Sequence, residues 1–168
     1  WYTSQGKGGE SVILPSQMEL VALVEQKPFS ELPKGDWLVS SDSDPQIRWK
    51  CNGWYLEQVQ LNMETLWPTG AVVLYYRTAQ QPDFLPTQMV YAKQTQQGTY
   101  VFQLPGVVVE EIRIDPASQG GVILQVEGME TKSNGFATFV PSWQQGALLL
   151  GLPPVGVALW SLLPRKKK

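Results

Sequence analysis

The sequence of 168 residues contains no histidine and a single cysteine, Cys51. The absence of histidine removes the commonest general base, the commonest zinc ligand and every catalytic triad that depends on an imidazole. It also leaves Cys51 without a histidine partner, which argues against a catalytic thiol. With one cysteine the chain forms no intramolecular disulfide, which is more typical of a bacterial extracytoplasmic domain than of a secreted eukaryotic one.

Positive charge is scarce outside the last four residues of the chain. There are 13 basic and 15 acidic residues, and the formal net charge is −2, but four of the basic residues stand at positions 165–168. The rest of the chain therefore has 9 basic against 15 acidic residues, a net charge of −6. Binding to a nucleic-acid backbone needs clustered Lys and Arg, so no nucleic-acid partner is expected.

No clear metal-binding motif is present. Asp42 and Asp44, together with Asp36, could offer oxygen ligands to calcium. The run lacks the glycine and the bidentate glutamate of an EF-hand loop, and Asp and Ser are ordinary turn residues. We therefore interpret 41–45 as a turn and predict neither a metal nor a cofactor.

Acidic residues close together in the sequence do not indicate a catalytic pair. On a strand, Glu111, Arg113 and Asp115 would share one face, because side chains alternate with a period of two. An exposed ion pair explains this pattern better than the acid and base of a glycosidase. Together with the missing histidine, this predicts that the chain is not an enzyme.

The body of the chain consists of short apolar segments separated by turns. Segments such as 99–104 and 110–115 alternate apolar and polar residues, as half-buried strands do. About nine or ten such segments occur at roughly 8–12-residue spacing, and no long amphipathic helix interrupts them. Segment 18–24 is either the first strand or a short helix. The predicted fold is all-β, an antiparallel β-sandwich or jelly roll over residues 11–145, preceded by a Gly-rich linker at 1–10.

Segments 46–51 and 54–63 form the clearest predicted hairpin. Asn52-Gly53 lies between them, the preferred pair for a type I′ turn. Alternation in the second segment predicts three core-facing side chains, Val59, Leu61 and Met63.

Aromatic residues cluster between positions 37 and 76. Flat aromatic faces stack on sugar rings, and neighbouring polar side chains bind the hydroxyl groups, so this region is a candidate saccharide site. The alternative is that these residues are ordinary strand and core residues. If 54 and 55 lie on one regular strand, one of the two must be exposed. The candidate ligand-binding residues are Trp49, Trp54, Tyr55, Trp67 and Tyr76.

Residues 146–164 are almost entirely apolar and are followed at once by the basic tail 165–168. The length matches the roughly 17–25 residues that cross a bilayer, and a basic cluster at one end is typical of the cytoplasmic side. This predicts a transmembrane segment with the β-domain outside the cytoplasm. Pro153-Pro154 favours the alternative, a buried apolar segment that completes the core.

A family resemblance is carried by residues 109–116, with the sequence VEEIRIDP, by the following Gly120-Gly121 and by the apolar strand after it. Residues 100–105 fit the same pattern. This stretch resembles β-sandwich domains, carbohydrate-binding-like, that are attached to bacterial membrane proteins and to glycosyltransferases of surface-polysaccharide assembly. The resemblance implies a non-catalytic, extracytoplasmic accessory domain with a glycan as one candidate ligand.

The predicted function is that of a non-catalytic domain of a membrane-associated protein in the bacterial cell envelope, with saccharide binding as its candidate activity. A glycan or an envelope protein would be its partner. The alternative is a protein-interaction or structural domain within a larger membrane assembly, in which exposed aromatic residues form a subunit interface.

Overall fold

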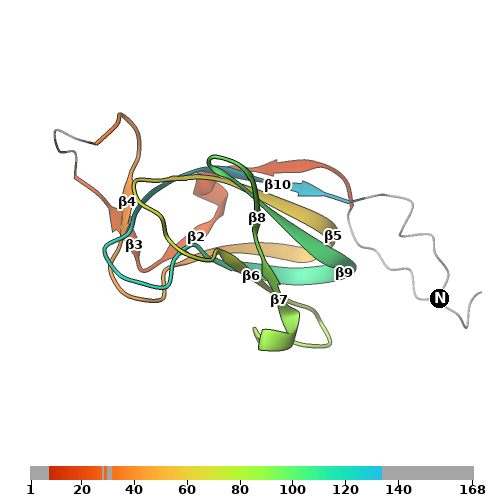
Figure 1. The fold of residues 1–168 in the computed structure, drawn as a ribbon. Helices are drawn as coiled ribbons and strands as arrows, with labels where there is room; N and C mark the ends of the chain where they lie inside the picture. Colours follow the sequence, from red (N-terminus) through yellow and green to blue (C-terminus); the bar gives the residue numbers. More distant parts are fainter. Residues whose placement is uncertain (1–7, 28, 30–31, 134–168) are drawn as a thin grey trace, which may run out of the picture. The chain divides into compact units, whose positions relative to one another are not determined.

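The computed structural model describes residues 8–27, 29 and 32–133, and within them it is all-β (Figure 1). Ten strands and two short 3-10 turns are present, which confirms the predicted fold class and the predicted number of strands. In chain order they are β1 (Ser11–Ile13), η1 (Pro15–Gln17), β2 (Glu19–Val21), β3 (Leu23–Glu25), β4 (Leu38–Ser40), β5 (Gln46–Thr65), β6 (Val73–Arg77), η2 (Pro86–Gln88), β7 (Met89–Tyr91), β8 (Lys93–Gln96), β9 (Thr99–Asp115) and β10 (Ile123–Lys132).

The strands form one antiparallel sheet with the order β3-β4-β10-β5-β9-β6-β7. Three short strands lie off this path: β1 pairs with β10, β2 with β5, and β8 with β9. β9 and β10, which follow each other in the sequence, are not neighbours, because β5 lies between them. The topology is therefore not a simple series of hairpins, as expected for a jelly roll.

The two long strands, β5 and β9, run through both layers of the sandwich. The beginning of β5 and the end of β9 lie with β2, β6 and β7. The remainder of both strands lies with β8 and β10. Figure 1 shows the layers one above the other, joined at the end of the molecule where β5 and β9 bend. The two faces of the sandwich are thus parts of one curled sheet.

The hairpin predicted around Asn52-Gly53 is wrong. Residues on both sides of this pair belong to β5, and both sides pair with β9 rather than with each other. Lys50 lies opposite Glu111 and Trp54 opposite Val109, so four residue steps on β5 match two on β9. Asn52 and Gly53 do have the positive φ angles of 50° and 81° that a type I′ turn needs.

A β-bulge explains the same dihedral angles. Positive φ is available to Gly and tolerated by Asn, and bulges use it as readily as tight turns do. A second irregularity lies on β9, where Leu56 is opposite Val107 and Gln58 is opposite Gln103. Its extra residues on β9 offset those of β5, so the two strands bend together and remain paired to their ends.

The core lies between the layers and follows the alternation seen in the sequence. Val59, Leu61 and Met63 are all completely buried, which confirms their predicted orientation. From β9, Phe102, Ile112 and Ile114 are completely buried as well. The alternation of inward- and outward-facing side chains shifts by one position at each bulge. Apolar side chains therefore face the core on both sides of the bulge, although the strands bend there.

Two further predictions concern segments 18–24 and 146–164. Segment 18–24 is neither one strand nor a helix, because Ala22, with a φ of 54°, separates β2 from β3. The apolar segment 146–164 lies outside the described residues. Within the residues that the structure describes, no helix is long and apolar enough to cross a membrane.

Candidate functional site

The aromatic residues proposed from the sequence do not gather into one site. Trp49 and Trp54 meet at the bend of β5, with ring centroids 5.7 Å apart and planes at 77°. Tyr76 is 8% exposed and belongs to the core, so its ring is not open to a ligand. Trp67 lies on the segment after β5 and is 56% exposed.

Trp49 and Trp54 are half-buried and close the core at the bend. They lie opposite Ile112 and Val109, and both of these β9 residues are completely buried. Directly opposite residues share a face of the sheet, so both tryptophans lie on the core-facing side, where they pack against the core and stay partly exposed. They serve the packing of the bend rather than a stacking surface.

Tyr55 points to the other face of β5 from Trp54. Its hydroxyl donates a hydrogen bond of 3.4 Å to Glu57 Oε1. Partial burial and the neighbouring charge of Glu57 raise the pKa of Tyr55, so the phenol stays protonated at neutral pH. Tyr55 and Trp54 are both half-buried, so neither of the two is the exposed residue that the sequence predicts.

A hollow of about 390 Å³ lies at the margin of the core, beside residues 66–70. Thr65 lies opposite Leu124, and Tyr100 lies opposite both Leu61 and Gln94. Leu61 and Leu124 are fully buried, and residues directly opposite each other share a face of the sheet. Thr65, Tyr100 and Gln94 therefore lie on the core-facing side of the sheet, at the margin of the core. The hollow is lined by Thr65, Leu66, Trp67, Pro68, Thr69, Gly70, Gln94 and Tyr100.

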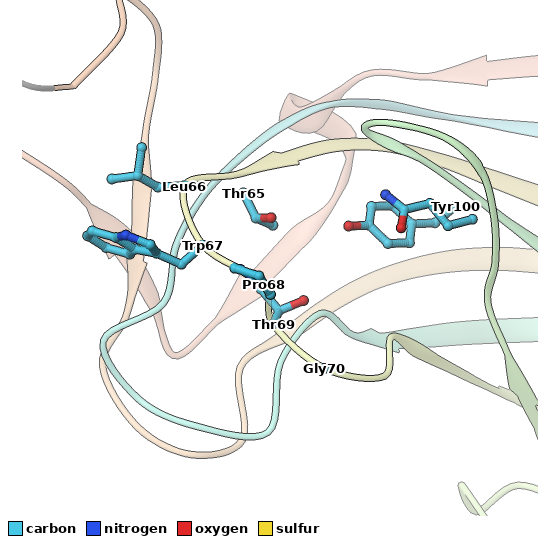
Figure 2. Close-up of a pocket in the computed structure, with 8 residues that line it drawn as sticks. Thr65, Leu66, Trp67, Pro68, Thr69, Gly70 and Tyr100 are labelled. Carbon is cyan, nitrogen blue, oxygen red and sulfur yellow. The ribbon is translucent and has the colours of Figure 1, made fainter.

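The lining of this hollow carries no carboxylate, amine or guanidinium group. It offers two threonines, the Gln94 amide and the rings of Tyr100 and Trp67. Figure 2 shows Tyr100 on one side and residues 66–70 on the other, with Trp67 pointing away from Tyr100. An apolar and aromatic surface with a few uncharged hydrogen-bonding groups suits a neutral, hydroxyl-rich ligand.

The hollow continues along the β8–β9 hairpin. A smaller hollow of about 90 Å³ shares Thr65, Gln94 and Tyr100 with it, and its lining adds Met63, Glu64, Gln97 and Gly98. Of these residues, sequence reasoning proposed none, and of the larger hollow it proposed Trp67 alone. The run of glutamines between 94 and 97 was the available signal, because amides that stand on an exposed edge strand are free to bind hydroxyl groups.

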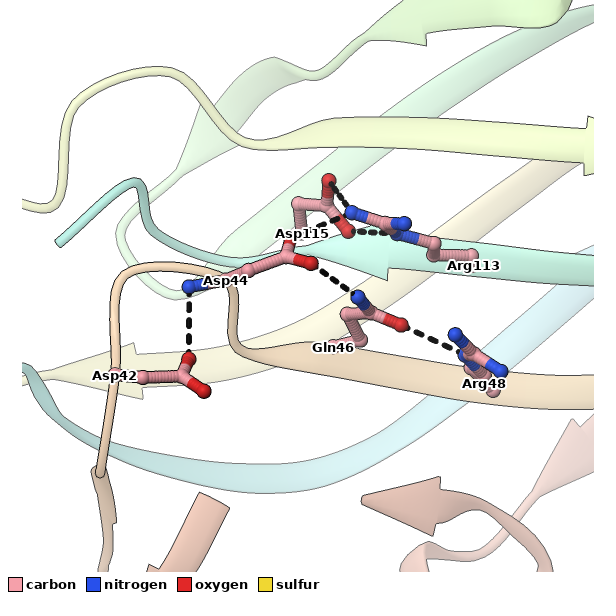
Figure 3. A network of polar contacts seen from close by, with 6 residues as sticks. All are labelled: Asp42, Asp44, Gln46, Arg48, Arg113 and Asp115. Carbon is pink, nitrogen blue, oxygen red and sulfur yellow. Dashed lines mark hydrogen bonds and ion pairs between the residues drawn. The ribbon is translucent and has the colours of Figure 1, made fainter. Parts of the chain in front are cut away.

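A network of polar side chains lies at the ends of β5 and β9 (Figure 3). Arg113 donates to both carboxylate oxygens of Asp115, at 2.7 and 2.9 Å, and to Asp44 at 2.5 Å. These bonds, chiefly the one with Asp115, raise the pKa of Arg113. The guanidinium carbon lies 5.5 Å from the centre of the Tyr75 ring. The ion pair predicted between Arg113 and Asp115 is confirmed.

The same network contains the predicted turn at 41–45. The Asp44 backbone N–H donates to Asp42 Oδ1 at 2.8 Å, as Asp does in a turn. Asp44 also accepts a hydrogen bond from Gln46 Nε2 at 2.6 Å, and Gln46 accepts one from Arg48 Nε at 2.7 Å. In the described residues no group of three or more His, Cys, Asp or Glu side chains could hold a metal ion.

Glu111 differs from its predicted role. It is 4% exposed rather than a solvated partner of Arg113, and it forms an ion pair with Arg77 of the neighbouring strand β6. Arg77 lies opposite Glu111 in the β6–β9 pairing, so strand register brings the charges together. Both groups are engaged with each other, and this arrangement leaves no free carboxylate pair at this point for acid–base chemistry.

No protein-family model matches this sequence, and no curated protein matches it. Among solved structures, the chain is similar to a point mutant of a family 29 carbohydrate-binding module, with a TM-score of 0.50 and 10% identity over 80% of this chain and 97% of that chain.

Two further solved structures resemble the chain. One is a low-affinity xylan-binding module, CBM86, from Roseburia intestinalis (TM-score 0.49, 12% identity, 77% of this chain and 99% of that chain). The other is a family 6 carbohydrate-binding module from Clostridium cellulolyticum in complex with xylose (TM-score 0.49, 7% identity, 73% and 97%). At such low identity the comparison concerns the fold alone, and the resemblance predicted from the sequence is confirmed at that level: the chain has a carbohydrate-binding-module-like jelly-roll fold.

Proposed function

We propose that this chain is a non-catalytic, saccharide-binding domain of a bacterial membrane-associated protein, located outside the cytoplasm. The observation that carries the saccharide part is the uncharged hollow beside Tyr100. Its size is within the roughly 300–1,000 Å³ of typical ligand sites. The fold is one on which carbohydrate-binding modules are built, but the argument for a ligand rests on the lining of the hollow.

Two features of the hollow favour a neutral sugar. Tyr100 supplies a ring whose inner part packs against the core, so a ligand would meet a rigid aromatic surface. Gln94 lies directly across from Tyr100 on β8, a strand whose four residues are all exposed, so its amide can turn toward bound hydroxyl groups. The lining has no cation to pair with a charged group, so this hollow favours the neutral part of a glycan.

Calorimetric titration of the 168-residue chain with a panel of neutral oligosaccharides tests the site. We expect Gln94→Ala and Tyr100→Leu each to weaken binding at least tenfold, because an aromatic or hydrogen-bonding anchor contributes on this scale. Tyr100→Leu keeps an apolar side chain against the core. Tyr91→Ala is the matched control, since Tyr91 is 62% exposed on β7 and lines none of the hollow. Equal affinities for all three variants would contradict the proposed site.

The membrane part of the proposal rests on residues 146–164 and the basic tail that follows them. We expect the full chain to sediment with bacterial membranes, and a chain without residues 146–168 to be released into the soluble fraction. An unmodified chain that is soluble without detergent would instead place the apolar segment in a core.

One observation favours a second function, a protein-interaction domain. β7 is the last strand in the order of the sheet, and its Tyr91 is 62% exposed. Edge strands with exposed aromatic side chains commonly pair with a partner protein. The Tyr91→Ala variant tests this function too: loss of co-purifying envelope proteins, with saccharide binding unchanged, would support it, and an unchanged set of partners would exclude this surface.

A further inference from the structure

A second hollow, of about 450 Å³, lies beside the first part of β5 and differs in charge from the one beside Tyr100. β2 covers this edge of β5 only from Gln46 to Arg48. Beyond Arg48 the edge is open, and η1 and the residues after it form the opposite wall. The lining residues are Ser16, Gln17, Met18, Glu19, Arg48, Trp49 and Lys50.

The lining has two cations and one carboxylate, in a chain whose body is strongly acidic. Arg77 and Arg113 are both held in ion pairs, but in the part of the chain that the structure describes neither Arg48 nor Lys50 forms one. Glu19 is the residue opposite Arg48 on β2, yet no ion pair joins them. Two cations against one carboxylate leave the lining of this hollow with a net positive charge.

The guanidinium of Arg48 is held in place by a hydrogen bond from its Nε. Its Nε donates to Gln46 Oε1 at 2.7 Å, and Gln46 is itself fixed by Asp44, which also accepts from Arg113 (Figure 3). The ring of Phe84 lies 5.9 Å from the guanidinium carbon. Gln46 is only 5% exposed, so the hydrogen bond that it accepts from Arg48 is shielded from solvent on its side, whereas Asp44 is exposed. Among the described residues no hydrogen bond or ion pair engages the terminal nitrogens of Arg48, which are therefore available to a ligand.

We propose that this hollow is a second binding site, which takes an oxyanion carried by a sugar. A fixed guanidinium presents parallel N–H groups that match the two oxygens of a carboxylate or of a phosphate ester. Lys50 adds a second cation, and Trp49 an apolar part of the wall. The shared chemistry is the oxyanion, and its two sources are a uronic acid and a sugar phosphate. The first hollow, without charged groups, would bind the neutral part of such a glycan.

The test is titration of the 168-residue chain with tetragalacturonate, with mannose 6-phosphate and with a neutral tetrasaccharide, at low and at high salt. We expect at least one of the two anionic probes to bind, with an affinity that falls as salt rises. Arg48→Gln should weaken that binding at least tenfold. Arg48→Lys keeps the charge but loses the parallel N–H groups of the guanidinium, so its affinity should lie between those of Arg48→Gln and the unmodified chain. Lys50→Gln should also weaken it, by a smaller factor. Lys34→Gln, which removes a cation from an exposed loop, is the matched control.

Each outcome decides the inference. Loss of uronate binding in Arg48→Gln identifies the carboxylate as the ligand group, and loss of mannose 6-phosphate binding identifies the ester. If neither probe binds the unmodified chain, or if Arg48→Gln and Lys50→Gln behave like Lys34→Gln, the site is overturned. The Lys50 side chain is exposed and makes no hydrogen bond within the described residues, so the Lys50→Gln variant is informative even if Arg48→Gln fails to fold. Neutral-saccharide binding, lost only in the Tyr100 and Gln94 variants, reports on the first hollow separately.

Discussion

Cys51 lies in the core at the bend of β5 and is 1% exposed. Burial raises the pKa of its thiol far above the ordinary range, more than the backbone hydrogen bond from Ile112 lowers it. At neutral pH the thiol is therefore protonated, with Sγ 3.6 Å from the carbonyl oxygen of Trp49. A single cysteine in this environment acts as a small apolar side chain.

The buried thiol predicts a loss of stability at alkaline pH. In the unfolded chain a cysteine ionises above about pH 8.5, whereas the folded chain holds its proton, so the folded state binds more protons there. The free energy of unfolding should fall by up to about 1.4 kcal/mol per pH unit above that value. Urea unfolding between pH 7 and 10.5 measures this slope. Cys51→Ala should be less steep, and an identical slope would show that Cys51 is ionised or exposed in the folded state.

Single residues were predictable from the sequence where the partner is close along the chain. Arg113 and Asp115 are two positions apart, and alternation alone places them on one face. The partner of Glu111 is 34 positions away, on β6, and no local pattern indicates it. The burial of Tyr76 was not predictable for the same reason, since it depends on strands that are distant in the sequence.

At the scale of elements, the bulge at Asn52-Gly53 is the point on which β5 turns. The φ angle of Gly53 is 81°, and a Cβ built there would meet nothing closer than Glu110 Oε1 at 3.9 Å. Any cost of a side chain at this position therefore comes from the backbone conformation and not from a clash.

Substitution at the bulge should be costly at Gly53 and mild at Asn52. We expect Gly53→Val to lower the free energy of unfolding by about 2 kcal/mol, because β-branched residues are strained at positive φ. Asn52→Gly should change it by less than about 1 kcal/mol, because glycine adopts the φ of 50° without strain. Chemical denaturation of both variants gives the comparison, and equal losses would mean that the bend does not need these dihedral angles.

The elements themselves were largely predictable, but their pairing was not. Alternating segments correctly indicated strands, and Asn52-Gly53 correctly indicated positive φ. The same dihedral angles suit a hairpin turn and a bulge, so the choice between them depends on whether β9 supplies a partner for both halves of β5. The β9 partners of the residues beside this bulge stand 55 to 61 positions further along the chain, and contacts across that separation leave no local pattern.

At the scale of the whole molecule, the curled sheet should unfold as one unit, because β5 and β9 belong to both layers. Leu74 lies in the layer that contains β6, and Leu61 lies in the layer that contains β10. Both side chains are completely buried. Leu74→Ala and Leu61→Ala should each lower the free energy of unfolding by about 2–5 kcal/mol. In each variant, tryptophan fluorescence and far-UV circular dichroism should report the same urea midpoint. Separate midpoints for the two probes would show that the layers unfold independently.

The fold class and the core were predictable at this scale, whereas the candidate site was not. The hollow beside Tyr100 combines the end of β5, the β8–β9 hairpin and residues 66–70, and it exists only after these segments meet. Trp67 was proposed because it is aromatic, and the run of glutamines between 94 and 97 was a signal that was not used, but Thr65 has no distinguishing pattern of its own. Sites made at strand ends in a jelly roll depend on topology, and the strand order of this sheet is not visible in the sequence.

The pairing of β1 with β10 has a mechanical consequence. Ser11 lies opposite Thr131, and the backbone N–H of Gly9 donates to Ser133 Oγ, so the first and the last described residues of the domain lie side by side. A tension applied between Gly9 and Ser133 would peel β1 from β10, breaking the hydrogen bonds one after another rather than all at once. The first strand would therefore separate from the domain at low force, while β10 remains paired with β5 and the rest of the sheet stays folded.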